Sequence, residues 1–187
     1  MIRPLFLIDG RMEKIILQKM HIDSPIRILD VNSKNTRIST IAERVIILRN
    51  SYSKRCDYII IIFDREGRTD SSKKIISELK TELLNRGIKD RLIIAVADRM
   101  IENWILADWD SFKKNVRVNK KNPSPPFEGR NGKSIIKQFL PTYQETTDGV
   151  ELFLDSNASE MKKNSQSFNN FISLIEPLGC ECRWLKR

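Results

Sequence analysis

The sequence predicts an α/β protein with a doubly wound, mainly parallel sheet. Two observations favour this class: the N-terminal half contains four short, continuous apolar runs, and segments with helical spacing of apolar residues separate them. Strands that alternate with helices in this way form parallel sheets whose crossover helices cover both faces. We expect residues 1–110 to form this core and residues 111–187 to form a basic loop and a helical C-terminal extension packed on the same domain.

Each expected strand is an apolar run that stops at a polar or turn-forming residue. The third run contains four consecutive isoleucines, which are β-branched and favour extended backbone. The expected strands are Leu5–Ile8, Ile26–Val31, Tyr58–Phe63 and Leu92–Ala97.

The expected helices carry apolar residues three and four positions apart. Pro123, Pro125 and Pro126 exclude a regular helix from the segment that contains them. In the core, helices are expected over Glu13–Met20, over Ile38–Arg49 and from Asp70 or Ser71 to about Arg86. A further helix is expected to begin at Asp98 and to carry Glu102, Trp104, Ile105 and Asp108. In the extension, they are expected over Gly132–Leu140, Val150–Leu154 and Ser167–Ile175.

Composition limits the function classes. Hydrophobic residues make up 40% and charged residues 30%, which is typical of a folded globular protein. No apolar run reaches membrane-spanning length, so we expect no membrane association and a cytoplasmic location. The only histidine is His21, which excludes mechanisms that need paired histidines. The net charge of +9 favours an anionic partner, most simply nucleic acid, although a solvated cationic face is a common alternative.

Acidic residues follow three of the expected strands. Asp9 follows the first, Asp64 and Glu66 follow the third, and Glu102 follows the fourth. The carboxyl ends of parallel strands form the ligand crevice, where collected carboxylates can hold a divalent metal. Asp64 and Glu66 are two residues apart, so in extended backbone they point to the same side. Each acid is also compatible with an ordinary turn or helix start.

Several short motifs contain or accompany these acids. The most specific is Met-Ile-Glu-Asn-Trp-Ile-Leu-Ala-Asp at residues 100–108. The others are Leu-Ile-Asp-Gly-Arg-Met-Glu at 7–13, Phe-Asp-Arg-Glu at 63–66, Gly132-Lys133 with Leu140-Pro141-x-Tyr143, and Ser167-Phe168-x-x-Phe171. Together they resemble a compact Toprim-type family, whose best-known relatives are the nuclease halves of overcoming-lysogenization-defect (OLD) proteins and similar phage-defence effectors.

The resemblance implies a Toprim-like, Rossmann-like fold that uses Mg²⁺ or Mn²⁺ to cleave phosphodiesters of DNA or of structured RNA such as tRNA. It further implies antiviral defence together with an ATPase partner of the OLD or SMC-like type. In the family pattern the acid after the first strand, here Asp9, serves as general acid or base, and the acids after the third strand, here Asp64 and Glu66, bind the metal. In the mechanism that we expect, Glu102 assists the metal ligands directly or through water, and Asp9 or Glu13 accepts or donates the proton. The sequence departs from the pattern at Asp9, where the family usually has Glu, and at Glu66, where it often has Asp.

Basic residues of the extension are candidate contacts for a nucleic-acid backbone, or else belong to a solvated loop. Gly129 to Ser134 does not fit a P-loop, because Phe127 stands where the first glycine is required. Lys133 instead lies beside an expected helix N-terminus, where it could contact one phosphate. The candidates are Lys113, Lys114, Arg117, Lys120, Lys121 and Lys133.

Two alternatives to a nuclease stay open. A catalytically degenerate Toprim-fold module would bind nucleic acid or dock a partner ATPase, using its acids only for structure. A nucleotidyl-transfer or primase-like activity would require a nucleotide.

Overall fold

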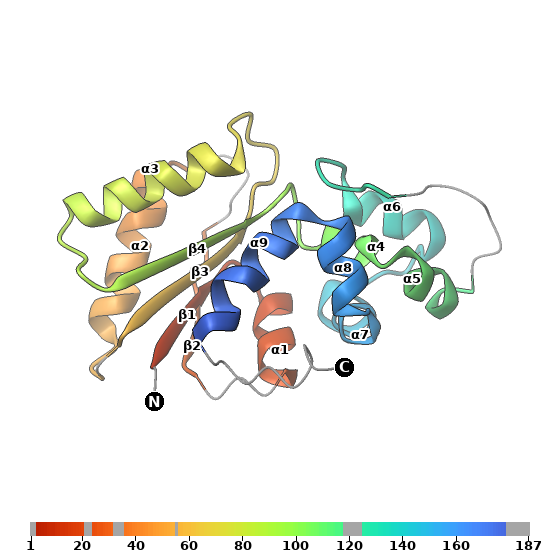
Figure 1. Ribbon diagram of the computed structural model, residues 1–187, viewed down its shortest axis with the longest axis horizontal. Helices are drawn as coiled ribbons and strands as arrows, with labels where there is room; N and C mark the ends of the chain where they lie inside the picture. Colours follow the sequence, from red (N-terminus) through yellow and green to blue (C-terminus); the bar gives the residue numbers. More distant parts are fainter. Residues whose placement is uncertain (1–2, 21–23, 32–35, 55, 118–124, 179–187) are drawn as a thin grey trace.

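A four-stranded, all-parallel sheet forms the centre of the protein (Figure 1). The computed structural model describes residues 3–20, 24–31, 36–54, 56–117 and 125–178, so His21, Lys120 and Lys121 lie outside the described residues. The spatial order is β2-β1-β3-β4, and the chain changes direction across the sheet between β1 and β3. The strands are β1 (Pro4–Ile8), β2 (Ile26–Ile28), β3 (Tyr58–Asp64) and β4 (Arg91–Ala97).

Helices cover both faces of the sheet, which confirms the doubly wound prediction. Alternate residues of each strand point to opposite faces. Leu7 and Ile61 pack in a core beneath α2 (Ile38–Ser51) and α3 (Ser72–Asn85), whereas Ile8 and Ile62 belong to a second core with α1 (Arg11–Lys19) and α9 (Gln166–Ile175). In Figure 1, α2 and α3 accordingly lie on one side of the strands, and α1 and α9 on the other. The strands are apolar throughout because both of their faces are buried.

The second strand is shorter than predicted. It ends at Ile28 instead of Val31, because Asp30 adopts a left-handed backbone with φ of 53°. The Leu29 N–H still donates to the Ile8 carbonyl at 2.7 Å, so the chain leaves the sheet directly after that bond. Asp30 is therefore a residue that follows a strand, as Asp9 is.

The helix expected from Asp98 begins later. Arg99 has a φ of 73°, which interrupts helical backbone, and α4 runs only over Glu102–Ala107. Asp108 then caps α5 (Trp109–Asn115), its carboxylate accepting from the Ser111 N–H at 3.2 Å. The first part of the expected basic loop is thus helical.

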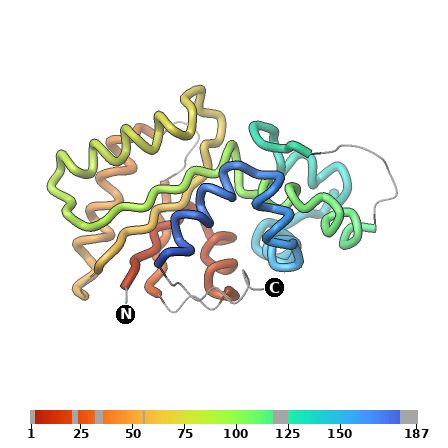
Figure 2. The backbone as a smooth tube through the Cα atoms, in the orientation of Figure 1, coloured from red at the N-terminus to blue at the C-terminus, as the bar shows by residue number. Residues whose placement is uncertain are grey.

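The C-terminal part returns to the sheet. Its elements are α6 (Gly132–Phe139), the π-helical turn η2 (Glu145–Gly149), α7 (Val150–Asp155), α8 (Ala158–Asn164), α9, and the 3₁₀ turn η3 (Glu176–Leu178). The elements α8 and η2 were not predicted. Figure 2 shows the chain passing from α8 into α9 alongside β4. None of the helices in the described ranges is long and apolar enough to cross a membrane.

Trp104 joins α4 to this returning segment. Its ring is 1% exposed and stacks on Phe171 with centroids 5.6 Å apart, while Phe168 meets it edge-on at 5.3 Å. The indole Nε1–H donates to the Ser167 hydroxyl at 2.8 Å. Trp104 is therefore a core residue.

Candidate functional site

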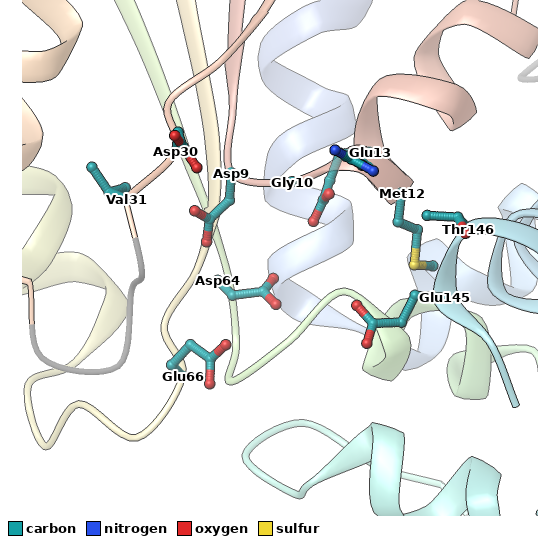
Figure 3. Close-up of a pocket in the computed structure, with 11 residues that line it drawn as sticks. Asp9, Gly10, Met12, Glu13, Asp30, Val31, Asp64, Glu66, Glu145 and Thr146 are labelled. Atoms are coloured by element: carbon teal, nitrogen blue, oxygen red, sulfur yellow. The ribbon is translucent and has the colours of Figure 1, made fainter.

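A pocket of about 710 Å³ lies at the carboxyl ends of β1 and β3. This is the point where strand order reverses, which is where open α/β sheets bind ligands. Figure 3 shows the carboxylates of Glu13, Asp64, Glu66 and Glu145 directed toward a common space. The acids that line the pocket are Asp9, Glu13, Asp30, Asp64, Glu66 and Glu145.

Asp9 and Asp64 stand on the two central strands. Asp9 directly follows β1, and its N–H continues the sheet by donating to the Ile62 carbonyl at 3.1 Å. Asp64 is the last residue of β3 and pairs with Ala97 of β4. Its carboxylate accepts from the Ile101 N–H at 3.0 Å. The sheet itself thus fixes the backbone of both acids.

Glu66 reaches the pocket for a different reason from the one predicted. It does not continue an extended strand, because its φ is 56° and it lies in the turn after β3. The turn is held by the Glu66 N–H, which donates to the Arg99 carbonyl at 2.7 Å. The Arg65 N–H also donates to Ala97 at 3.0 Å. Asp64 and Glu66 do share the pocket, but a left-handed turn brings them there.

Glu13 lies in the first turn of α1 and is 7% exposed. Burial raises the pKa of Glu13 from 4.5 to about 7, and the negative charges of Asp9, Glu102 and Glu145 add to this rise. The carboxylate folds back over Gly10, so that a Cβ at position 10 would lie 3.0 Å from Glu13 Oε2. Glycine at this position leaves room for the buried acid.

The pKa of Asp64 is raised for the same two reasons as that of Glu13. Desolvation raises the pKa of Asp64 well above its usual range, and the charges of Glu13, Glu102, Asp9 and Glu66 raise it further. Carboxylates that perturb one another in this way are close enough to repel. A cation placed among them would relieve that repulsion.

Glu102 does not line the pocket. It begins α4 and is 4% exposed, and the Tyr143 hydroxyl donates to its Oε1 at 3.4 Å. Burial raises the pKa of Glu102, and the charge of Glu145 raises it further. Tyr143 also lies 4.0 Å from the Met12 sulfur. Glu102 therefore lies behind the pocket. Tyr143 connects it to Met12, which lines the pocket.

The candidate basic residues divide into two groups. Lys133, at the start of α6, does not itself line the pocket but forms an ion pair with Glu145, which does. Lys113 and Lys114 belong to α5, with Arg117 just beyond, and none of these three lines the pocket. In Figure 1, α5 lies at the end of the molecule away from the sheet. Lys113 is paired with Asp110 at 2.8 Å.

Sequence reasoning missed Asp30 and Glu145. Asp30 follows a strand, so the rule that selected Asp9 would have found it had the end of β2 been placed at Ile28. Glu145 carries no local signal, because it comes from an unpredicted π-helical turn and reaches the pocket only through tertiary folding.

The donor chemistry fits a hard cation such as Mg²⁺ or Mn²⁺, because the acidic groups offer only carboxylate oxygens. Within the described ranges, no three His, Cys, Asp or Glu side chains converge into a ready-made metal cage. Mg²⁺ usually keeps several waters and uses only one or two protein carboxylates, so a closed cage is not required. The residues present therefore fit such a cation in an open site.

Comparison with known proteins gives one match. No curated protein and no solved structure matches the chain. Residues 7–176 match a protein family described as "Domain of unknown function (DUF4276)". The matched range extends from β1 to the end of α9 and includes all six acids that line the pocket. Since the match spans most of its length, the chain belongs to the DUF4276 family.

Proposed function

We propose that this protein is a divalent-cation-dependent nuclease that hydrolyses phosphodiester bonds in DNA or structured RNA. The observation that carries the proposal is the position of Asp9 and Asp64 at the carboxyl ends of β1 and β3, the two strands between which sheet order reverses. Glu13 and Glu66 line the same pocket. Carboxylates grouped at such a crevice suit metal-assisted phosphoryl chemistry.

Asp64 and Glu66 are the proposed ligands of one or two Mg²⁺ or Mn²⁺ ions. Glu102 assists through water, a role supported by its burial behind the pocket. The bound cation would polarise a phosphoryl oxygen and neutralise charge that develops in the transition state. Asp9 or Glu13 accepts the proton of the attacking water, and both line the pocket.

The electrostatics of the pocket support a cation in particular. The pKa values of Glu13, Asp64 and Glu102 are all raised, first by burial and then by neighbouring acids. A folded protein gains stability from any ligand that binds its native state selectively. A divalent cation would do so here by replacing repulsion between carboxylates with attraction.

Nucleic acid is the proposed partner because the chain carries a net charge of +9. Lys133 is the candidate for a phosphate near the pocket, and Lys113, Lys114 and Arg117 are candidates for backbone contacts farther away. The resemblance to OLD-type nucleases favours an ATPase of the OLD or SMC-like type as a second partner, in cytoplasmic antiviral defence. In keeping with a separate ATPase, α6 follows a turn instead of the strand that a P-loop requires.

A cleavage assay tests the proposal. Purified protein is incubated with DNA and with structured RNA, with and without Mn²⁺ and with the candidate ATPase present. The double variant Asp64→Asn with Glu66→Gln should lose all cation-dependent cleavage. Asp70→Asn is the matched control, since Asp70 pairs with Lys74 on the surface and does not line the pocket. Full activity in the double variant would refute the assignment.

Two further variants test whether Asp9 or Glu13 accepts the proton of the attacking water. If Asp9 handles it, Asp9→Asn should remove cleavage and spare cation binding, because the amide keeps the shape of the acid but cannot accept a proton. Loss of cleavage in Glu13→Gln with retention in Asp9→Asn would give the role to Glu13. If no substrate is cleaved in any condition although nucleic acid is bound, the degenerate binding module becomes the better description.

A further inference from the structure

Glu145 and Lys133 form an ion pair at the pocket that the sequence did not predict. Glu145 begins η2 and Lys133 is the second residue of α6, so both come from the C-terminal part of the chain. Their side chains are 45% and 40% exposed. Glu145 lines the pocket together with the acids of β1, α1 and β3. The C-terminal extension thus contributes Glu145 and Thr146 to a pocket whose other lining residues belong to the core.

Lys133 is the counter-ion of Glu145 beside the acidic pocket, which Arg11 also lines. Its hydrogen bond to Glu145, together with the negative charges of Glu145, Glu102 and Glu66, raises the pKa of Lys133. Glu145 in turn lies within electrostatic reach of Glu13 and Glu102. In Figure 3 the Glu145 carboxylate faces Asp64 and Glu66 across the pocket. Glu145 could therefore help to hold a cation that binds in this pocket.

We propose that Glu145 is a further cation-binding carboxylate of the pocket, and that Lys133 and the divalent cation compete for it. This inference rests on the proposed cation site. Partly exposed ion pairs are weak, so an ion of twice the charge held by several acids can displace the ammonium. The displaced Lys133 is then left at the pocket with a free ammonium. Contact of Lys133 with a substrate phosphate thus becomes conditional on cation binding.

Isothermal titration of the 187-residue chain with Mn²⁺ alone tests this competition. Lys133→Gln should tighten Mn²⁺ binding about tenfold, because the competing charge is gone. Glu145→Gln should weaken it about tenfold, because a ligand is gone. In the double variant, Mn²⁺ should bind as in Glu145→Gln, since without Glu145 there is nothing to compete for. Lys133→Arg keeps a cationic partner for Glu145 and should stay near the wild-type affinity.

Matched controls separate competition from general charge effects. The control variants are Lys137→Gln and Glu151→Gln. Lys137 lies one turn farther along α6 than Lys133, and Glu151 lies on α7 just after η2. Both side chains are exposed, and neither lines the pocket. Neither control should change Mn²⁺ affinity. Thermal unfolding without metal checks the fold of each variant. If Glu145→Gln does not fold, the Mn²⁺ affinity of Lys133→Gln alone tests the competition between Lys133 and the cation.

The outcomes also separate this inference from the cation site itself. Tightening by Lys133→Gln of equal size with and without Glu145 would mean a long-range charge effect and would overturn the competition. Unchanged Mn²⁺ affinity in Glu145→Gln would remove Glu145 from the site. In both cases loss of binding in Asp64→Asn would leave the cation site standing. No Mn²⁺ binding by the wild type would reject the site and the competition together.

Discussion

The Asp64 carboxylate accepts a hydrogen bond from the backbone N–H of Ile101 at 3.0 Å. This bond ties the end of β3 to the turn that precedes α4, and the same side chain lines the acidic pocket. The hydrogen bond and the proposed cation site place two different demands on Asp64. Its oxygen satisfies a backbone donor, and in the proposed site its charge would hold a cation.

Replacing Asp64 should separate these two demands. Asp64→Asn keeps an acceptor oxygen for Ile101 and removes a repelled charge, so the cation-free melting temperature should stay equal or rise. The increase in melting temperature that millimolar Mn²⁺ gives the wild type should disappear. Asp64→Ala leaves the Ile101 N–H without this acceptor and should lower the free energy of unfolding by about 1–3 kcal/mol. A full Mn²⁺ response in Asp64→Asn would show that Asp64 is not a ligand.

Stability without divalent cations should depend on pH through Glu13. Its pKa rises from 4.5 to about 7 on folding, so the folded state holds the proton more tightly than the unfolded state. The resulting stabilisation is complete below pH 4.5 and is lost as the pH rises through about 7. It amounts to about 3 kcal/mol. Urea unfolding of the wild type and Glu13→Gln between pH 4.5 and 8 measures it.

The comparison with Glu13→Gln is needed because other buried acids also titrate. The difference in unfolding free energy between the two proteins should change with pH in favour of the wild type as the pH falls. Saturating Mn²⁺ should flatten this dependence, since a bound cation favours the ionised acids. A pH-independent difference between the two proteins would mean that Glu13 is not perturbed by folding.

Gly149→Ala should disturb the packing of Tyr143 against Glu102 behind the pocket. A Cβ at position 149 would collide with the Tyr143 hydroxyl and would lie 3.0 Å from Met12 Cε. Tyr143 would have to move away from Glu102, and such overpacking typically costs about 1–3 kcal/mol of unfolding free energy. Gly67→Ala is the control, because a Cβ there meets nothing within 4 Å. Equal stability of the two variants in urea unfolding would contradict the packing described.

Nucleic-acid affinity should fall steeply with salt if α5 contacts the phosphate backbone. Replacing Lys113 and Lys114 by Gln should reduce the slope of log affinity against log salt by roughly 0.7–0.9 for each lost contact. The control replaces Lys73 and Lys80, which are exposed and belong to α3, a helix that lies over the sheet and away from α5 (Figure 1). Fluorescence anisotropy with a labelled oligonucleotide measures both. An unchanged slope in the α5 variant would make these lysines ordinary solvated residues.

The fold was largely predictable because its signals are local. The four isoleucines of β3 are apolar at every position, and only a strand buried on both faces requires that. Element ends were harder to predict. Asp30 and Arg99 adopt a left-handed backbone conformation that their residue types do not predict. The second strand was therefore predicted to end too late, and the helix that contains α4 was predicted to begin too early.

The site was predictable in part. Asp9 and Asp64 were selected from the sequence because each stands where an apolar run ends, and the carboxyl ends of parallel strands form the ligand crevice. Glu66 was selected for a strand geometry that it does not have, and Glu102 proved to lie behind the pocket. Glu145 could not have been found, because it approaches from a turn far away in the sequence.

The sequence by itself determined that this chain forms a parallel α/β sheet with acids at its carboxyl edge, because apolar runs and the turns that end them act over a few residues. Only the tertiary structure decided which acids meet. The return of the C-terminal helices brings Glu145 and Lys133 to the pocket, and Tyr143 to Glu102. Those contacts depend on how whole elements pack, and the packing also buries the carboxylates and raises the pKa values of Glu13 and Asp64.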